Sequence, residues 1–299
     1  MAAADPQPSN RFIGRPVVRR VVVNGDDFGY SHAVNQAIIR SHTSGILTSA
    51  SLMVTGAAFP EAVELARQHP SLGVGLHLVV STGRAVLPSY EIPHLVDASG
   101  AFPDDPLLVG LRYQFNRAAR RELFGEIRAQ LQRFRDTGLA LSHVDGHLHN
   151  HIHPYVLHCL LLLAKEFGIR FIRLPHEEIS VDRSTGARPG PGAIILWTIF
   201  QLLRAHAVRR LSAQQIGYAD RVYGLLHSGR ITETYLTKLI PLIEADRVEI
   251  YAHPAWCGDD RPPHGKEIDG FLELQALTST SVRQLLEQTG FERVTFFDL

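Results

Sequence analysis

Apolar positions along the chain follow two patterns, short continuous runs and helical spacings. Short aliphatic and β-branched runs predict strands that are buried on both faces. Apolar residues that recur every three or four positions predict amphipathic helices. The predicted strands begin at 19–23 and continue with 46–54, 72–80, 139–144, 169–175, 247–254 and 293–299, and the predicted helices lie at 31–44, 59–68, 118–137 and 155–167. This alternation predicts an α/β fold with a parallel sheet, either a doubly wound layer or a barrel.

Two stretches depart from the alternation. Residues 81–105 are rich in Pro and Ser and predict a long loop, a feature that is usually functional or mobile. Residues 184–228 contain the apolar run "AIILWTIFQLLRAHAVRRL", which turns basic toward its end. It fits either a core helix with a cationic end that suits the helix dipole, or a surface that meets an apolar substrate or a membrane face. We therefore expect a flexible lead-in at 1–18 and one domain at 19–299 with an insertion at about 184–228.

Composition narrows the class of protein. The 299 residues are 45% hydrophobic and 20% charged, which is ordinary for a globular chain. Thirty basic and thirty acidic residues leave no net charge, which argues against nucleic-acid binding. No apolar run approaches the roughly 20 residues of a transmembrane segment, and the N-terminus has no apolar core of a secretory signal. Two cysteines cannot form a disulfide framework, so we expect a cytoplasmic protein with Cys159 in its core; a homodimer is the general prior.

Polar and titratable residues collect where predicted strands end. They are Asp26 and Asp27 after the first strand, His77 in the third, Asp145 and His147 after the fourth, Arg173 in the next and His253 at the end of the last long strand. Because the site of a parallel α/β fold lies at the carboxyl ends of its strands, we expect these side chains to converge. Taken singly, the Asp pair also suits a turn, His77 a core position and Arg173 a structural salt bridge.

A run of histidines follows the fourth predicted strand. His143, Asp145, His147, His149, His151 and His153 alternate along the sequence. A period of two places them on one strand face, and a buried polar face of that size needs a metal ion or a water-filled cleft. Alternatively, the last three lie in an exposed loop. In either case we expect at least one metal ligand in this run.

These residue types together indicate a catalytic metal site. One carboxylate and two imidazoles form a three-ligand site for a divalent cation, with positions left for water or substrate. The second carboxylate of the Asp26–Asp27 pair then suits a general base, and His253 a general acid. Three other functions remain open: a phosphoesterase with two or three metal ions, a two-histidine, one-carboxylate iron oxygenase, and a sugar- or lipid-binding protein with a structural metal.

The segments "VNGDDFGYSHAVNQAI", "GILTSASLMV", "GVGLHLVV", "HVDGHLHNHIHP", "IRLP" and "EIYAHP" resemble the YdjC/ChbG family of carbohydrate deacetylases over nearly the whole chain. The regions "YADRVYGLLHSGRIT" and "VEIYAHPAW" are more similar to its hopanoid biosynthesis-associated HpnK subgroup. Gly25 stands where the family usually has alanine, and Ala255 stands where glycine is common.

The resemblance implies an irregular (β/α) barrel with one divalent metal ion, zinc or magnesium. The metal ligands carried over are Asp27, His77 and His147, with Asp26 as catalytic base and His253 as acid. The residues expected to support these groups or to contact substrate are Asp145, Arg173, Asp220, Tyr223 and His227. The implied reaction removes the N-acetyl group of an amino sugar. The subgroup implies an N-acetylglucosaminyl hopanoid and transient contact with the inner membrane, with chito-oligosaccharides as the alternative substrate.

Overall fold

A curled parallel sheet forms the centre of the molecule, as seen in the computed structural model, which describes residues 18–186, 190–256 and 270–299. The strand order is β6-β3-β2-β1-β8-β7, and β9 pairs with the first residues of β1. The strands are β1 (Arg19–Phe28), β2 (Ser49–Leu52), β3 (Gly73–Leu78), β4 (Gly83–Arg84), β5 (Ala101–Phe102), β6 (Val144–Gly146), β7 (Arg221–Tyr223), β8 (Arg247–Ala252) and β9 (Phe291–Arg293). All pairs in the main sheet are parallel, whereas β4 and β5 form a separate antiparallel pair.

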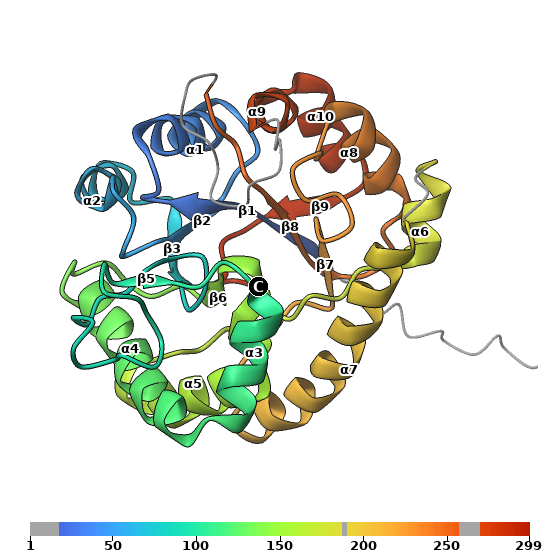
Figure 1. Cartoon of the computed structure of the whole chain (residues 1–299). Coiled ribbons are helices and arrows are strands. Elements are labelled where there is room, and N and C mark those ends of the chain that lie inside the picture. The colour runs from blue at the N-terminus through green and yellow to red at the C-terminus, as the bar shows by residue number, and fades with distance from the viewer. Residues whose placement is uncertain (1–17, 187–189, 257–269) are drawn as a thin grey trace, which may run out of the picture.

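Helices surround the strands as a ring (Figure 1). They are α1 (His32–Ser44), α2 (Phe59–Gln68), α3 (Pro106–Phe115), α4 (Arg117–Arg135), α5 (Pro154–Phe167), α6 (Ile179–Ser184), α7 (Pro191–Ala213), α8 (Glu233–Leu239), α9 (Gly270–Thr278) and α10 (Thr280–Gln288), with 3₁₀ helices η1 (His147–Ile152) and η2 (Ile240–Leu242). The predicted start of α1 is confirmed, because the side chain of Ser31 accepts a hydrogen bond from the Val34 N–H. Helix α2 has the predicted bounds.

The sheet is a half-barrel and does not close as a regular TIM barrel within the described residues. Between β6 and β7 the neighbouring segments are joined by single bridges, Val144 to Ile172, Phe171 to Gly217 and His176 to Val222, in place of a continuous ladder. The α/β class and the parallel sheet are therefore confirmed, and the implied barrel is corrected to a curled half-barrel. Its strands still direct their carboxyl ends toward one side, where β1, β3, β6 and β8 end close together.

Strand β1 is the centre of the sheet and is buried over most of its length. Its first half pairs with β9 and β8, and its second half pairs with β8 and β2. The run Val21–Val23 is fully buried, as expected of a strand covered on both faces. The large hydrophobic core extends from this sheet to the surrounding helices, and Cys159 is buried in it as predicted. Strand β1 therefore fixes the position of the acidic pair that follows its apolar run.

Several predicted boundaries were wrong. The expected strand at 139–144 begins only at Val144, and the expected terminal strand at 293–299 is instead β9 at 291–293. The expected loop at 81–105 contains the β4–β5 pair, and α3 directly after it was not predicted. Within the expected insertion at about 184–228, β7 pairs with β8 of the main sheet. The lead-in at 1–17 lies outside the described residues.

The apolar helix α7 is not a core helix along its first half. Ile195, Leu196, Ile199 and Leu202 are exposed, whereas Phe200, Ala207 and Leu211 are buried. Its second half carries the basic residues that the sequence showed. The expectation of a core helix therefore holds for the second half of α7 only, and contact of its exposed half with an apolar substrate or a membrane stays a prediction. In the described part of the chain, no helix combines the length and the apolarity that crossing a membrane requires.

Candidate active site

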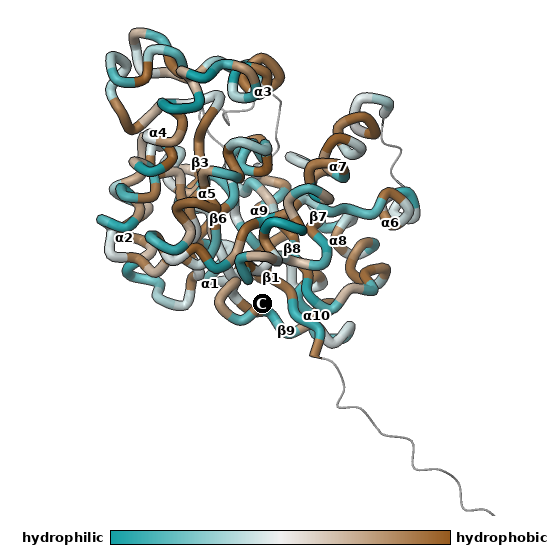
Figure 2. Tube along the Cα trace, turned by 90° about the horizontal axis from the view of Figure 1, so that it is seen from below, coloured by the Kyte–Doolittle hydropathy of each residue, from teal (hydrophilic) through white to brown (hydrophobic). Residues whose placement is uncertain are grey.

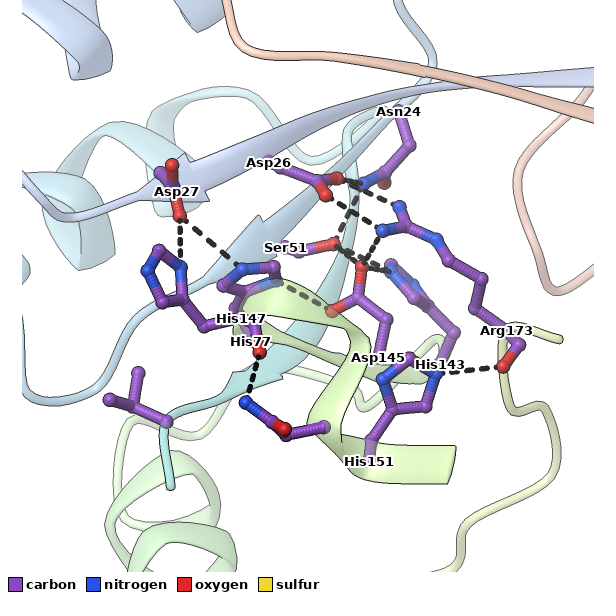
Figure 3. A network of polar contacts seen from close by, with 12 residues as sticks. Asn24, Asp26, Asp27, Ser51, His77, His143, Asp145, His147, His151 and Arg173 are labelled. Atoms are coloured by element: carbon purple, nitrogen blue, oxygen red, sulfur yellow. Dashed lines mark hydrogen bonds and ion pairs between the residues drawn. The ribbon is translucent and has the colours of Figure 1, made fainter. Parts of the chain in front are cut away.

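The two carboxylates at the end of β1 point to different partners. Asp26 continues the extended strand, whereas Asp27 has a positive φ of 64°, a conformation that Asp tolerates better than most residues. Figure 3 shows the result: Asp27 faces His77 and His147, and Asp26 faces Arg173. Both aspartates are buried, with only 2% of each exposed. The turn at the end of β1 thus places two adjacent acids in two different environments.

Asp27, His77 and His147 form a cluster that fits a metal ion. Oδ1 of Asp27 lies 3.3 Å from His77 Nε2 and 3.2 Å from His147 Nδ1. One ligand atom from each of the three residues lies within 4.8 Å of the others. Two ligands of a tetrahedral zinc ion, with bonds near 2 Å, are separated by about 3.3 Å, so the spacing matches a shared cation. One carboxylate and two imidazoles are also a donor set for zinc, and the carboxylate admits magnesium.

The charge balance of the site favours a cation in this cluster. Four carboxyl groups are buried in the site, on Asp26, Asp27, Asp145 and Glu249, and the site has one permanent cation, Arg173, which pairs with all of them except Asp27. Burial alone lowers the pKa of His77, but the charge and the hydrogen bond of Asp145, with Asp27 and Asp26, raise it to about 10. The site therefore attracts positive charge strongly. A divalent ion would supply it in place of that proton, because a histidine ligand must be neutral.

Asp145 orients the His77 ring. Nδ1 of His77 donates to Asp145 Oδ1 at 2.9 Å, which leaves Nε2 directed at Asp27. The other oxygen of Asp145 accepts from Ser51 Oγ at 2.7 Å and pairs with Arg173 at 2.7 Å. Burial alone raises the pKa of Asp145, but Arg173 and His77 hold it well below its usual range. This is the carboxylate–histidine arrangement that fixes the ring orientation of metal ligands.

Arg173 connects three carboxylates. Its two terminal nitrogens bind Asp26 at 2.7 and 2.8 Å, and its Nε binds Glu249 at 2.5 Å. Its guanidinium also lies 4.5 Å from the centre of the Tyr251 ring. Burial alone lowers the pKa of Arg173, but Asp145, Asp26 and Glu249 raise it well above its usual value. Because the side chain is fully buried, Arg173 fixes Asp26 in place and has no exposed surface for substrate.

His147 lies in a 3₁₀ helix, not in a strand. Strand β6 ends at Gly146, and η1 follows with positive φ at Leu148 and His149. The prediction of one alternating strand face was therefore wrong. The alternative prediction, that the later histidines lie in an exposed loop, was also wrong, since His149 and His151 are buried. His149 contacts the hydroxyl of Tyr251 at 2.9 Å, and Nε2 of His151 donates to the Arg173 carbonyl at 2.8 Å. Only His147 of the run reaches the metal cluster.

His253 completes the site from the end of β8. Its Nε2 lies 3.9 Å from Asp26 Oδ2, and the side chain is 9% exposed. Its backbone N–H donates to Glu273 Oε2 at 2.5 Å, and the other oxygen of Glu273 accepts from the Ile231 N–H at 2.9 Å. Burial raises the pKa of Glu273 to about 7. Glu273 thereby holds the end of β8 against the loop that follows β7.

The last three predicted contacts pair with residues outside the metal cluster. Asp220 pairs with Arg247 at 2.7 Å before the first residue of β7, at the opposite end of the sheet. Tyr223, at the carboxyl end of β7, is buried and donates to Glu178 at 3.0 Å. His227 stacks on Tyr235, with ring centres 4.0 Å apart. The prediction for Asp220 as a substrate contact is corrected, because it stabilises the start of β8 instead.

Sequence reasoning missed five residues of this network, which are Asn24, Ser51, Glu249, Tyr251 and Glu273. Asn24 donates to Asp26 Oδ1 at 2.8 Å and to Ser51 Oγ at 2.7 Å. One signal was available: Glu249 and Tyr251 interrupt the apolar strand "RVEIYAHP" at alternate positions, which predicts that both face the same side of the sheet. Ser51 and Glu273 carry no comparable signal.

The chain was also compared with known proteins. A family model described as "YdjC-like protein" matches residues 20–288. The chain belongs to the YdjC-like family. A carbohydrate deacetylase of Brevibacillus brevis is 32% identical to this YdjC-like chain over 284 residues, which cover 94% of the chain and 99% of that relative. A carbohydrate deacetylase of Mus musculus is 32% identical over 303 residues, covering 94% of each. A chitooligosaccharide deacetylase of Salmonella heidelberg is 27% identical over 289 residues, covering 94% of the chain and 99% of that relative.

A solved structure shares the fold of this YdjC-like chain. It is a protein of Enterococcus faecalis V583, provisionally described as a cellobiose-phosphate cleavage protein. The two superpose with a TM-score of 0.74 over 94% of this chain and 98% of the other, at 24% sequence identity. This similarity supports the fold alone. The resemblance to the family as a whole is confirmed, whereas the finer resemblance to the HpnK subgroup stays a prediction.

Proposed function

We propose that this YdjC-like protein is a metal-dependent hydrolase that removes the N-acetyl group from an amino sugar. One observation carries the proposal: Asp27 belongs to a cluster that could hold a metal ion, whereas the adjacent Asp26 is bound by Arg173 beside His253. Deacetylation needs both groups, a metal ligand and a proton acceptor, at one centre. The similarity to carbohydrate deacetylases of B. brevis and M. musculus supports the same reaction class.

Each residue has a proposed task. Asp27, His77 and His147 would hold the divalent cation, which supplies polarisation of the acetyl carbonyl and a lower pKa for a water molecule. Asp26 takes the proton of the attacking water, and its bonds to Arg173 and Asn24 keep its carboxylate in one orientation. His253, in its protonated form, donates a proton to the departing amine. Its Nε2 lies 3.9 Å from Asp26 Oδ2, which places both groups within reach of one amide.

The proposed substrate is an N-acetylglucosaminyl hopanoid. Two features support it: the resemblance of residues 218–232 and 248–256 to the HpnK subgroup, and the exposed apolar side chains of α7. Chito-oligosaccharides are the second candidate, favoured by the similarity to the S. heidelberg chitooligosaccharide deacetylase. Both substrates present the same N-acetyl group to the same residues. They differ only in what is attached to the sugar.

The test is acetate release from N-acetylglucosaminyl hopanoid and from di-N-acetylchitobiose, after the enzyme is loaded with zinc or magnesium. We expect release by the wild type. We expect loss of both metal and activity in His147→Ala, and retained metal with at least roughly 100-fold lower kcat in Asp26→Asn. Asp220→Asn is the matched control and should keep full activity, since Asp220 pairs with Arg247 at the far end of the sheet.

Three results would contradict parts of the proposal. No acetate from either substrate rejects deacetylation. Full activity of Asp26→Asn with bound metal rejects the role of Asp26 as the base. Acetate from chitobiose but not from the hopanoid keeps the reaction and moves the substrate to free sugars.

A further inference from the structure

Two helices far apart in the sequence expose matching apolar stripes. In α3 the exposed residues are Leu107, Leu108, Leu111 and Phe115, and in α7 they are Ile195, Leu196, Ile199 and Leu202. Positions separated by one, four, and seven or eight residues lie on one side of a helix, so each set forms a single stripe. Phe115 is 76% exposed and Leu202 is 70% exposed. Large apolar side chains gathered in this way on a surface mark a site of interaction.

Both helices stand on the side of the molecule where the strands end. Figure 2 shows α3 and α7 rising on that same side, with β9 and α10 at the other end. Each is fixed to the segment that carries His147. The ring of Tyr113 in α3 lies 6.1 Å from the ring of His153, and Phe200 in α7 lies 5.5 Å from His149. The two apolar stripes therefore flank the candidate metal centre and have fixed positions relative to it.

The charged residues in and next to these two helices are mostly basic. Residues 106–121 and 190–213 contain seven arginines and no Asp or Glu, although the whole chain has no net charge. Arg112, Arg117, Arg121 and Arg209 are exposed. Asp105 directly precedes the first of these ranges and caps α3, and Glu122 directly follows it. Apolar stripes bordered by arginine are the pattern of helices that lie in the interface of an anionic lipid membrane.

We propose that α3 and α7 together dock this protein on an anionic membrane surface, with the metal centre facing the lipid headgroups. A second copy of the chain fits this face less well, because a symmetric interface would bring the arginine-rich segments of both copies together with few acidic residues beside them. An anionic bilayer satisfies both the apolar stripes and the arginines. The inference deepens the proposed function, since docking would present a lipid-linked amino sugar to Asp26 and the metal centre.

The test is co-sedimentation of the metal-loaded protein with vesicles of phosphatidylcholine, and with vesicles of phosphatidylcholine that contain phosphatidylglycerol. We expect binding to the second kind, weakened by salt. Phe115→Ser and Leu202→Ser should each lower the partition coefficient by roughly tenfold or more, because each removes a large apolar group from the interface. Phe297→Ser is the matched control, since Phe297 is also exposed but follows β9 at the other end. Arg117→Gln with Arg209→Gln should remove the preference for phosphatidylglycerol.

Three results would overturn the docking proposal. The first is that the protein sediments with neither kind of vesicle. The second is that the wild type and the Phe115→Ser, Leu202→Ser double variant sediment equally. The third is that light scattering shows a dimer of the wild type and a monomer of this double variant. Sedimentation does not require turnover, so it is independent of the deacetylase assay. The double variant should also deacetylate a soluble N-acetyl sugar at the wild-type rate. If the wild type does not deacetylate the soluble sugar, that result counts against the proposed function and not against docking.

Discussion

Arg173 determines the electrostatics of the site at the scale of single residues. It is the partner of Asp26, Asp145 and Glu249, all of them buried. Removing one partner of a buried ion pair is costly because it leaves charge without compensation. Arg173 therefore has two tasks, to hold the proposed base in position and to make a group of buried carboxylates tolerable.

We predict that Arg173→Met lowers the free energy of unfolding by about 3–5 kcal/mol, because methionine fills similar space but leaves the carboxylates unpaired. Arg247→Met is the matched control, since Arg247 pairs with a single carboxylate, Asp220, and both side chains are more than one-third exposed. Its cost should be at most about 1 kcal/mol. Urea unfolding at neutral pH measures both. Equal small losses in the two variants would show that the buried network does not stabilise the fold.

His151 gives a pH-dependent prediction at the same scale. Burial, only partly offset by Asp145 and the Arg173 carbonyl, lowers its pKa from 6.5 to about 4. Between these values the unfolded chain binds a proton that the folded chain does not, so acidification costs stability. In the metal-free protein, His151→Gln keeps a donor for the carbonyl but cannot titrate. Between pH 7 and pH 5, the free energy of unfolding of the wild type should fall by about 2 kcal/mol more than that of the His151→Gln variant. Parallel pH curves from urea unfolding would contradict this.

The sequence predicted the chemistry of single residues better than their contacts. Asp26, Asp27, His77, Asp145 and His147 converge, because each follows or lies in a parallel strand whose carboxyl end faces one side. The positive φ of Asp27, which separates the two acids, depends on the turn and not on residue type. Glu273 could not be predicted, since its helix meets β8 only in the folded structure.

Strand β3 must pass unusually close to the segment before β6, and Gly75 permits this approach. A Cβ at Gly75 would lie against the His143 ring and 2.6 Å from the His143 carbonyl oxygen. That contact is far shorter than van der Waals packing allows. His143 cannot withdraw easily, because its side chain is buried and stacks on Phe296 with ring centres 3.8 Å apart.

At the scale of elements we therefore predict that Gly75→Ala destabilises the fold by about 2–3 kcal/mol, through overpacking. Gly110→Ala in α3 is the control, because its Cβ would meet only His153 Cδ2, at 3.8 Å. Alanine in a helix interior should raise stability there by up to about 1 kcal/mol. Thermal unfolding of both variants measures the difference. A neutral Gly75→Ala would mean that β3 and His143 are farther apart in solution.

Among the elements, periodicity identified the helices that bury one regular apolar face and failed where the apolar residues are not confined to a buried face. Helices α1, α2 and α5 lie within a residue of their predicted bounds, since each buries a regular apolar face. Helix α3 was missed because its apolar residues face outward as well as inward, which removes the amphipathic signal. The histidine run was taken for a strand because alternation in sequence cannot reveal the left-handed backbone at Leu148 and His149.

For the molecule as a whole, the order of elements predicted a parallel sheet and a site at one end of it. Incomplete closure was not predictable, because it depends on single bridges near 171–172 and 217 that no periodicity marks. The same end carries the metal cluster, the proposed base and acid, and the two exposed apolar helices. The candidate site and the proposed docking helices thus lie on one side, while the large core forms between the sheet and the helices around it.

That division predicts how the whole molecule responds to metal removal. The extensive hydrophobic packing between the sheet and the helices does not depend on a cation, so the fold should persist without one. A cation that binds only the folded state adds stability, about 2.7 kcal/mol at a free concentration 100 times its Kd. Chelation should therefore lower Tm by a few degrees, leave the near-ultraviolet circular dichroism intact and abolish acetate release. Zinc or magnesium should restore both Tm and activity, whereas the Tm of His147→Ala should respond to neither treatment. Unfolding on chelation would instead identify a structural metal, and an equal shift in His147→Ala would place the cation elsewhere.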